Sequence, residues 1–178
     1  IKLKKLGLND KIIEWIKEYL TNRKQKVTIG EISSDWKEML SGVPQGSVLG
    51  PLLFILFIND MPTVINNIMK LFADDSKLLA TVKNLTDCTT LQDDLNTLFD
   101  WSIKWQMSFN ENKCKVMKIS KNNNILKDEL TKINFYISGH ILSETKLERD
   151  LGVFISNDLR WSEHIKIIAA KANGIMGM

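Results

Sequence analysis

The sequence has few of the residues that build disulfide scaffolds, zinc sites or membrane anchors. It contains two cysteines, two histidines and three prolines in 178 residues. Cys88 and Cys114 lie far apart in the sequence, so neither a disulfide scaffold nor a close cysteine pair for a metal is indicated. The longest apolar run, Val48 to Ile58, is too short to span a bilayer. We therefore expect neither a small secreted scaffold nor a membrane partner.

The chain also lacks a large net charge. The chain carries 24 Lys and Arg against 21 Asp and Glu, so its formal charge of +3 permits contact with phosphates without arguing for it. A composition that is 44% hydrophobic and 25% charged is ordinary for one globular domain with a sizeable core. No signal peptide is visible, so we expect an intracellular location, in either the nucleus or the cytoplasm. The first residue is Ile1 rather than Met, which indicates a piece of a longer chain.

Helices and short strands are expected to alternate along the chain. Helices are predicted to start at Asn9 or Asp10, within residues 47–51, at Asn84 or Thr86, and at Trp161. Strands are predicted around residues 27–29, 36–40, 68–73, 77–82, 113–119, 133–137, 141–142 and 151–155, with a polar loop at 121–128. This order predicts an α+β fold, with helices packed on a mostly antiparallel sheet.

Two adjacent aspartates, Asp74 and Asp75, stand between two of the predicted strands. A tight hairpin would turn at these residues. Adjacent carboxylates repel each other unless a cation neutralises them, most naturally a hard divalent ion with oxygen ligands. The pair taken alone is equally typical of an ordinary solvated turn, because Asp is a frequent turn residue.

A loop rich in glycine and proline precedes this hairpin. Residues 42–51 contain three glycines at a spacing of four and two prolines, so the backbone can approach another molecule closely. Gln45 stands in its middle and can donate and accept hydrogen bonds towards a base or a sugar. The apolar run 52–58 then predicts a buried helix, with Pro51 in its first turn. The alternative interpretation is a plain loop at the start of that helix.

Other groups have two possible roles. Arg23, Lys24 and Lys26 lie where a predicted helix passes into a strand, and they could meet phosphates or simply form a solvated turn. Trp101 and Trp105 follow the helical spacing of neighbouring leucines, so we expect them to pack in a core rather than to stack on bases.

The stretch Gly42-Val43-Pro44-Gln45-Gly46-Ser47-Val48-Leu49-Gly50-Pro51, followed after about twenty residues by Leu71-Phe72-Ala73-Asp74-Asp75, resembles the reverse transcriptases of non-LTR retrotransposons. Further resemblance runs through residues 15–27, 101–117 and 151–165, which extends it over essentially the whole chain. The pattern is similar to that of the jockey and CR1-like elements of animals.

The resemblance implies a right-hand polymerase palm, with partial fingers and palm over residues 1–156 and the start of the thumb over 157–178. It implies RNA-directed DNA synthesis, with an RNA template, a DNA primer and deoxynucleoside triphosphates as partners. Two Mg²⁺ ions would clamp the attacking and leaving oxygens. Asp74 matches the family's metal ligand at the first position of the pair, and Asp75 matches the second, which supports the site electrostatically.

The resemblance also assigns roles to residues outside the pair. Lys113 falls where the family carries a lysine that either protonates the pyrophosphate leaving group or acts electrostatically. The other roles implied are contact with the template and the incoming nucleotide by Pro44, Gln45, Gly46 and Ser47, a floor near the primer end made by Phe72 and Ala73, and a primer-grip strand at Leu151, Gly152 and Val153.

One motif of the family has no match in these residues. The family's first catalytic aspartate lies in a strand ahead of the region that resembles residues 2–8, and neither Asp10 nor Asp35 matches it. Mg²⁺ demands near-ideal octahedral geometry, so we expect weak metal binding and no activity from these 178 residues alone. The alternatives are a non-catalytic nucleic-acid-binding remnant that uses residues 23–26 and the glycine-rich loop, or a decaying transposon product. The oligomeric state is not predicted.

Overall fold

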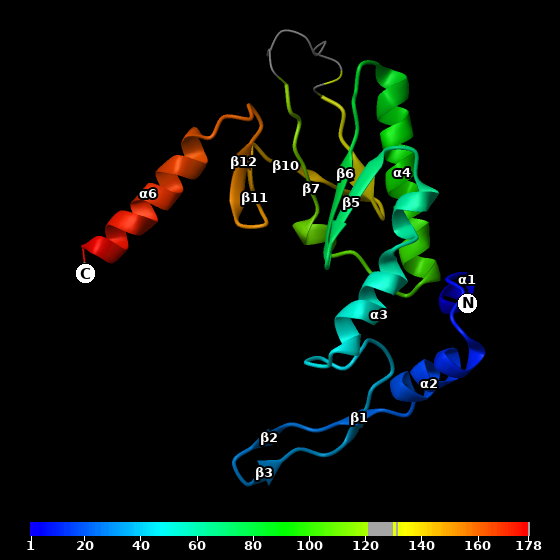
Figure 1. The fold of residues 1–178 in the computed structure, drawn as a ribbon. Coiled ribbons are helices and arrows are strands. Elements are labelled where there is room, and N and C mark those ends of the chain that lie inside the picture. The colour runs from blue at the N-terminus through cyan, green and yellow to red at the C-terminus, as the bar shows by residue number, and fades with distance from the viewer. Residues whose placement is uncertain (121–129, 131, 178) are drawn as a thin grey trace. The chain divides into compact units, whose positions relative to one another are not determined.

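The computed structural model describes residues 1–120, 130 and 132–177. The chain divides into two compact units, one of Ile1–Thr63 with Lys70–Lys77 and the other of Val64–Met69 with Leu78–Met178. Both contain helices and short strands, so the chain is a mixed helix-and-sheet protein, as predicted (Figure 1). The expected boundary between residues 156 and 157 stays a prediction. Among the described residues, no helix has both the length and the apolar character needed to cross a membrane.

The first unit begins with two helices, α1 (Lys2–Lys5) and α2 (Asp10–Leu20). Asn9 caps α2, since its side chain accepts a hydrogen bond from the Lys11 backbone at 2.9 Å. The ammonium of Lys2 bonds the Phe57 carbonyl and the Asp60 carboxylate, both at 2.6 Å. This half-buried cation therefore ties the start of the chain to the end of α3 (Leu49–Ile58) and to η1 (Met61–Val64).

A narrow β-ribbon follows α2. Strand β1 (Lys24–Gln25) pairs with β4 (Lys37–Glu38), and β2 (Thr28–Ile29) pairs with β3 (Ile32–Ser33), both antiparallel. The strands predicted around residues 27–29 and 36–40 do not pair with each other. Gly30, at φ 60, turns the chain early, so β2 meets the unpredicted strand β3 and the later strand pairs with β1.

The predicted hairpin is present as β5 (Ile68–Phe72) and β6 (Asp75–Leu79). Its two turn residues are Ala73 and Asp74, so Asp75 is already the first residue of β6. Ala73 adopts φ 49, which is uncommon for a residue with a side chain. The hairpin has little apolar anchoring, since Met69 is the buried side chain of β5 while Ile68 and Phe72 are 59% and 62% exposed.

Helix α4 (Leu85–Lys104) organises the second unit. Asn84 and Asp87 form a reciprocal capping box at its start, which resolves the predicted choice between Asn84 and Thr86. Trp101 is buried, as predicted for a core residue. Cys88 of α4 belongs to a core cluster whose other buried members are Leu130, Phe135, Ile137 and Leu142. Burial raises the pKa of the Cys88 and Cys114 thiols, and both cysteines are free.

The remaining strands do not form the continuous sheet that was predicted. Every described strand belongs to a two-stranded sheet. Turns interrupt the apolar stretches, as at Ser138 and Gly139, where φ is 55 and 75 and the chain reverses after two residues. The pairs are parallel β7 (Lys115–Val116) with β10 (Ser143–Glu144), and antiparallel β8 (Tyr136–Ile137) with β9 (His140–Ile141) and β11 (Leu147–Asp150) with β12 (Val153–Ser156).

Two further expectations concern this part of the chain. The strand predicted from residue 151 begins instead at Val153, because Leu151 and Gly152 have φ 46 and 91 and form the turn between β11 and β12. The loop predicted at residues 121–128 lies outside the described residues.

Helix α6 (Ser162–Met176) starts after Trp161, as predicted. It packs on β12, where the Phe154 backbone N–H donates to Nδ1 of His164 at 3.2 Å. The His164 ring also lies edge-on to Trp161, with centroids 6.3 Å apart. Three isoleucines at helical spacing on α6, Ile165, Ile168 and Ile175, are 57%, 47% and 75% exposed.

Asp94 of α4 is a buried charge, 1% exposed, inside the second unit. Its carboxylate accepts four hydrogen bonds of 2.8 to 3.1 Å, from the backbone N–H and side-chain amide of both Asn66 and Asn67. Burial alone would raise the pKa of this carboxyl, but the four donors outweigh burial and lower the pKa below its ordinary value. Asp94 therefore fixes the residues that immediately precede β5.

This shift predicts a loss of stability in acid. Because the pKa of Asp94 is lower in the folded chain, its contribution is complete above the pKa of an unfolded Asp, about 4, and is lost as pH falls through the folded pKa. At pH 7, we expect Asp94→Asn to lower the free energy of unfolding by about 1–3 kcal/mol. Urea unfolding between pH 7 and 3 should show this difference shrinking below about pH 4. A difference that stays constant across that range would contradict the assignment, and Asp93→Asn is the control at an exposed neighbour.

Candidate functional site

The glycine-rich loop ahead of α3 is held together by the hydroxyl of Ser47. This hydroxyl donates to the Pro44 carbonyl at 2.7 Å and accepts from the Gly50 backbone N–H at 3.0 Å. It thereby supplies a partner for one of the N–H groups at the start of the helix. Gly46 adopts φ 78, the left-handed region that glycine occupies without strain. Ser47 thus supports the loop from within.

Gly50 is the buried residue at which this loop closes on the helix. A Cβ atom added there would lie 2.9 Å from the Pro44 carbonyl oxygen and 2.9 Å from the Ser47 hydroxyl oxygen. Real Cβ atoms do not approach other atoms so closely, and the first of these neighbours is backbone. The spacing of glycines read from the sequence therefore has a steric cause at position 50.

Arg23 holds the other end of the same loop. Its guanidinium donates to the carbonyls of Leu20 at 2.9 Å, Ser41 at 3.2 Å and Gly42 at 2.5 Å. One cation therefore joins the end of α2 to the first residues of the loop. Lys26 lies over the Trp36 ring, 5.2 Å from its centroid. Of the predicted phosphate-binding cluster, Arg23 is thus engaged with the protein backbone.

Between these two supports the loop presents Gln45 to solvent. Its side chain is exposed and bonds to no other described residue, whereas Pro44 is half-buried. The donors and acceptors of the Gln45 side chain are therefore not used by the described residues.

Asp74 and Asp75 are both exposed, and neither carboxylate is bonded to another described residue. The tip of their hairpin, Lys70–Lys77, belongs to the same compact unit as the glycine-rich loop. Phe72 and Ala73 precede the pair and are exposed as well. Two carboxylates are the kind of ligand that Mg²⁺ prefers. Within the described ranges, however, no three His, Cys, Asp or Glu side chains gather closely enough to hold a metal.

The other predicted site residues belong to the second unit. Lys113 ends the short helix η2 (Glu111–Lys113) and is exposed, and its backbone N–H donates to the Asn110 carbonyl at 2.9 Å. Leu151 and Gly152 form the β11–β12 turn, and Val153 opens β12. The structure therefore brings together the loop and the aspartate pair in one unit, and Lys113 and residues 151–153 in the other.

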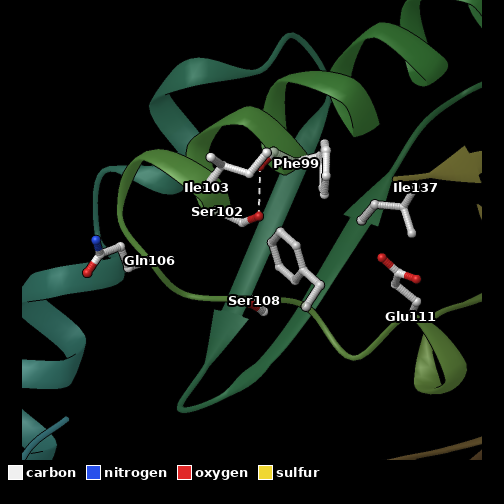
Figure 2. A pocket seen from close by; sticks show the side chains of 8 residues that line it. Phe99, Ser102, Ile103, Gln106, Ser108, Glu111 and Ile137 are labelled. Atoms are coloured by element: carbon white, nitrogen blue, oxygen red, sulfur yellow. Dashed lines mark hydrogen bonds between the residues drawn. The ribbon is translucent and has the colours of Figure 1, made fainter. Parts of the chain in front are cut away.

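The second unit also has a cavity of about 250 Å³ near the end of α4. Figure 2 shows Phe99, Ser102 and Ile103 of the helix facing Ile137 across it, with Gln106, Ser108 and Glu111 at its border. The Ser102 hydroxyl bonds the Phe99 carbonyl at 2.7 Å, so it is already used within the helix. None of the predicted site residues lines this cavity.

Two residues have long-range bonds that the sequence analysis did not predict. Arg23 was grouped with neighbouring lysines, although nothing local distinguishes a guanidinium that bonds carbonyls eighteen and nineteen residues away. Asp94 did carry a signal, because it lies between Leu91 and Leu98 on the apolar face of α4. An acid on such a face indicates a buried charge with partners.

Comparisons with known proteins agree over most of the chain. The family model described as reverse transcriptase (RNA-dependent DNA polymerase) matches residues 1–166. The chain is 33% identical over 168 residues to the RNA-directed DNA polymerase from mobile element jockey of Drosophila funebris. The aligned region covers 89% of this chain and 18% of that polymerase. No solved structure matches the chain.

Two relatives from Drosophila melanogaster are similar to the chain over the same region. One is the jockey polymerase, 27% identical over 159 residues, which covers 84% of this chain and 17% of the relative. The other is the probable RNA-directed DNA polymerase from transposon X-element, which is 29% identical over 165 residues. That aligned region covers 88% of this chain and 17% of the relative. The chain thus spans less than a fifth of the length of these curated relatives.

The packing at Gly50 predicts opposite effects for two glycine substitutions in helices. Gly50→Ala should lower the free energy of unfolding by about 1–3 kcal/mol, because the added methyl group overpacks the loop. Gly174→Ala in α6, where no atom lies within 4 Å of an added Cβ, should raise it by up to about 1 kcal/mol through helix propensity. Urea unfolding followed by circular dichroism measures both. A stabilised Gly50→Ala chain would show that the loop does not pack as described.

Proposed function

Because the chain belongs to the reverse transcriptase family, we propose that it forms the part of a non-LTR retrotransposon's RNA-directed DNA polymerase that carries the nucleotide-binding loop and two metal-binding carboxylates. One observation carries this proposal. The glycine-rich loop of residues 42–50 and the exposed Asp74–Asp75 pair, which are the two most specific motifs, belong to one compact unit. Both have polar groups free of other described residues.

The loop would bind the template and the incoming nucleotide. Glycine at positions 42 and 46 lets the backbone take φ 78 and approach a base or a sugar closely. Gln45 would make the polar contact, while Pro44 and Ser47 keep the loop in shape. The Ser47 hydroxyl is occupied by Pro44 and Gly50, which favours an indirect role for this residue.

The hairpin would hold the metal ions of the reaction. Two Mg²⁺ ions, when bound there, would neutralise charge that develops on the phosphate of the nucleotide during transfer to the primer. Asp74, in the turn, and Asp75, at the start of β6, would be ligands, and their oxygens suit this hard cation. Phe72 and Ala73 would form the floor beneath the primer end. Lys113, exposed and in the second unit, would protonate the leaving pyrophosphate or stabilise it electrostatically.

The carboxylate oxygens of Asp74 and Asp75 are the type of ligand that Mg²⁺ binds, but two carboxylates are few for this ion. These 178 residues contain no match to the family's first catalytic aspartate, so we propose that they do not catalyse the reaction on their own. Further carboxylates would be needed to hold the ions, because Mg²⁺ gives up water reluctantly.

The same family argument supports an arrangement for the whole polymerase. Residues 1–156 would belong to the partial fingers and palm, and 157–178 to the start of the thumb, with Leu151–Val153 in the primer grip. The partners would be an RNA template, a DNA primer and deoxynucleoside triphosphates. An intracellular location stays a prediction.

A non-catalytic nucleic-acid-binding role for residues 23–26 receives less support. The guanidinium of Arg23 is bonded to three backbone carbonyls, and Lys26 lies over Trp36. A phosphate would have to compete with these contacts. The structure describes no feature that favours a decaying product without a role.

Metal binding at the hairpin is testable without catalysis. We expect Mn²⁺, a paramagnetic substitute for Mg²⁺, to broaden the amide signals of residues 72–77 in the NMR spectrum, because Asp74 and Asp75 would bind it. Asp74→Asn with Asp75→Asn should abolish the broadening, and Asp93→Asn should preserve it. Broadening that is absent from the hairpin, or that survives in the double variant, would sink the metal assignment.

Catalysis by the chain alone is testable by primer extension. We expect no extension of a DNA primer on an RNA template with Mg²⁺ above that of an Asp74→Ala sample, because these residues contain no match to the family's first catalytic aspartate. The products are resolved on a denaturing gel. Extension by the unaltered chain that disappears in Asp74→Ala would overturn the proposed inactivity and leave the family role in place.

A further inference from the structure

The hairpin that carries Asp74 and Asp75 is weakly held by apolar contacts, although its carboxylates need a fixed geometry. Catalytic groups work only when they are held within about 0.5 Å of the productive position. Most side chains of β5 and β6 are exposed or half-buried, and Met69 is the fully buried member of β5. Another kind of support is therefore needed where the hairpin begins.

That support is the group of Asp94, Asn66 and Asn67, here called the Asp94 clamp. Oδ1 of Asp94 accepts from the Asn66 backbone at 2.8 Å and from its side-chain amide at 3.1 Å. Oδ2 accepts from the Asn67 backbone and side-chain amide, both at 2.8 Å. Each oxygen thus serves one asparagine, and the ionised carboxylate is fully hydrogen-bonded although it is buried.

The element that supplies Asp94 is well anchored. The capping box of Asn84 and Asp87 fixes the start of α4, and Leu98 and Trp101 are buried further along it. The clamp therefore joins a rigid helix to the two residues immediately ahead of Ile68, the first residue of β5. Asp74 follows seven residues after Asn67, along the uninterrupted strand and the turn.

We propose that Asp94 is a positioning residue for the aspartate pair, because it fixes the direction in which β5 leaves Asn67. This inference rests on the proposed function, since it gives Asp74 and Asp75 their metal-binding role. Asp94 itself is buried and contacts neither metal nor nucleotide in this scheme. Its effect on them passes through Asn66, Asn67 and the strand.

The decisive variant is Asp94→Asn, which keeps the volume of the side chain and so limits any packing defect. Its amide group would point two N–H donors at the donors of one asparagine, so half of the clamp would be lost. Hydrogen exchange of the full chain should then be faster at residues 68–79. We expect this increase to exceed that in α4 by at least about tenfold.

Two further variants define the result. Asp93→Asn, one residue away on the exposed face, should leave exchange in the hairpin unchanged. Asn67→Ala removes one donor at 2.8 Å and retains the carboxylate and the backbone bonds, so it should give a smaller increase at the same residues even if Asp94→Asn does not fold. An equal increase of the exchange rate in the hairpin and in α4, or no increase in the hairpin, would overturn the proposal. Asp94 would then stabilise the fold without positioning the hairpin.

Mn²⁺ alone distinguishes this inference from the proposed function. If both are right, Asp94→Asn should weaken Mn²⁺ binding at residues 72–77 by at least about threefold, since misplaced ligands bind a metal less well. Asp93→Asn should bind it as the unaltered chain does. If the unaltered chain binds no Mn²⁺, the metal role fails, and hydrogen exchange still decides whether the clamp holds the hairpin. Normal Mn²⁺ affinity in a chain whose hairpin exchanges faster would show that the clamp does not position the carboxylates.

Discussion

The buried carboxylate of Asp94 is the constraint on which the second unit depends most. Taking a charge out of water is costly, and it is tolerated here because four N–H donors surround the two oxygens. The same bonds make the contact directional, which apolar packing is not. A strand with little apolar surface to bury is thereby given a defined starting point. The hydrogen bonds of Asp94 fix the residues ahead of β5, while the apolar core around Cys88 and Phe135 stabilises the position of α4.

The first unit relies on the same principle at a smaller scale. Arg23 and Ser47 each bind backbone groups of the glycine-rich loop, and together these bonds support its shape. Local bonds of this kind leave the contacting surface free, as the exposed Gln45 and Asp74 show. The proposed site for a nucleic acid would have to remain open, so its shape would come from bonds behind the surface.

Sequence patterns predicted what local chemistry determines. Asn9 and Asn84 were predicted as helix starts because capping needs only neighbouring residues. The spacing of the glycines predicted the loop, and the aspartate pair predicted the hairpin. Strand pairing was predicted poorly, since the partner of Lys37–Glu38 depends on where Gly30 turns the chain. Leu151 lies in a turn at φ 46, a conformation that a leucine does not signal. The roles of Arg23 and Asp94 depend on partners many residues away, which no local pattern contains.

The division of the described strands into pairs has a consequence for how the protein meets other chains. In a two-stranded sheet neither member is central, so each strand has one long side without a strand beside it. Such sides carry backbone N–H and C=O groups that can accept another strand, from the same polypeptide or from a neighbour. In β5 and β6, the side chains are largely exposed as well. The backbone next to the two aspartates therefore belongs to strands that each have a long side without a described strand beside it.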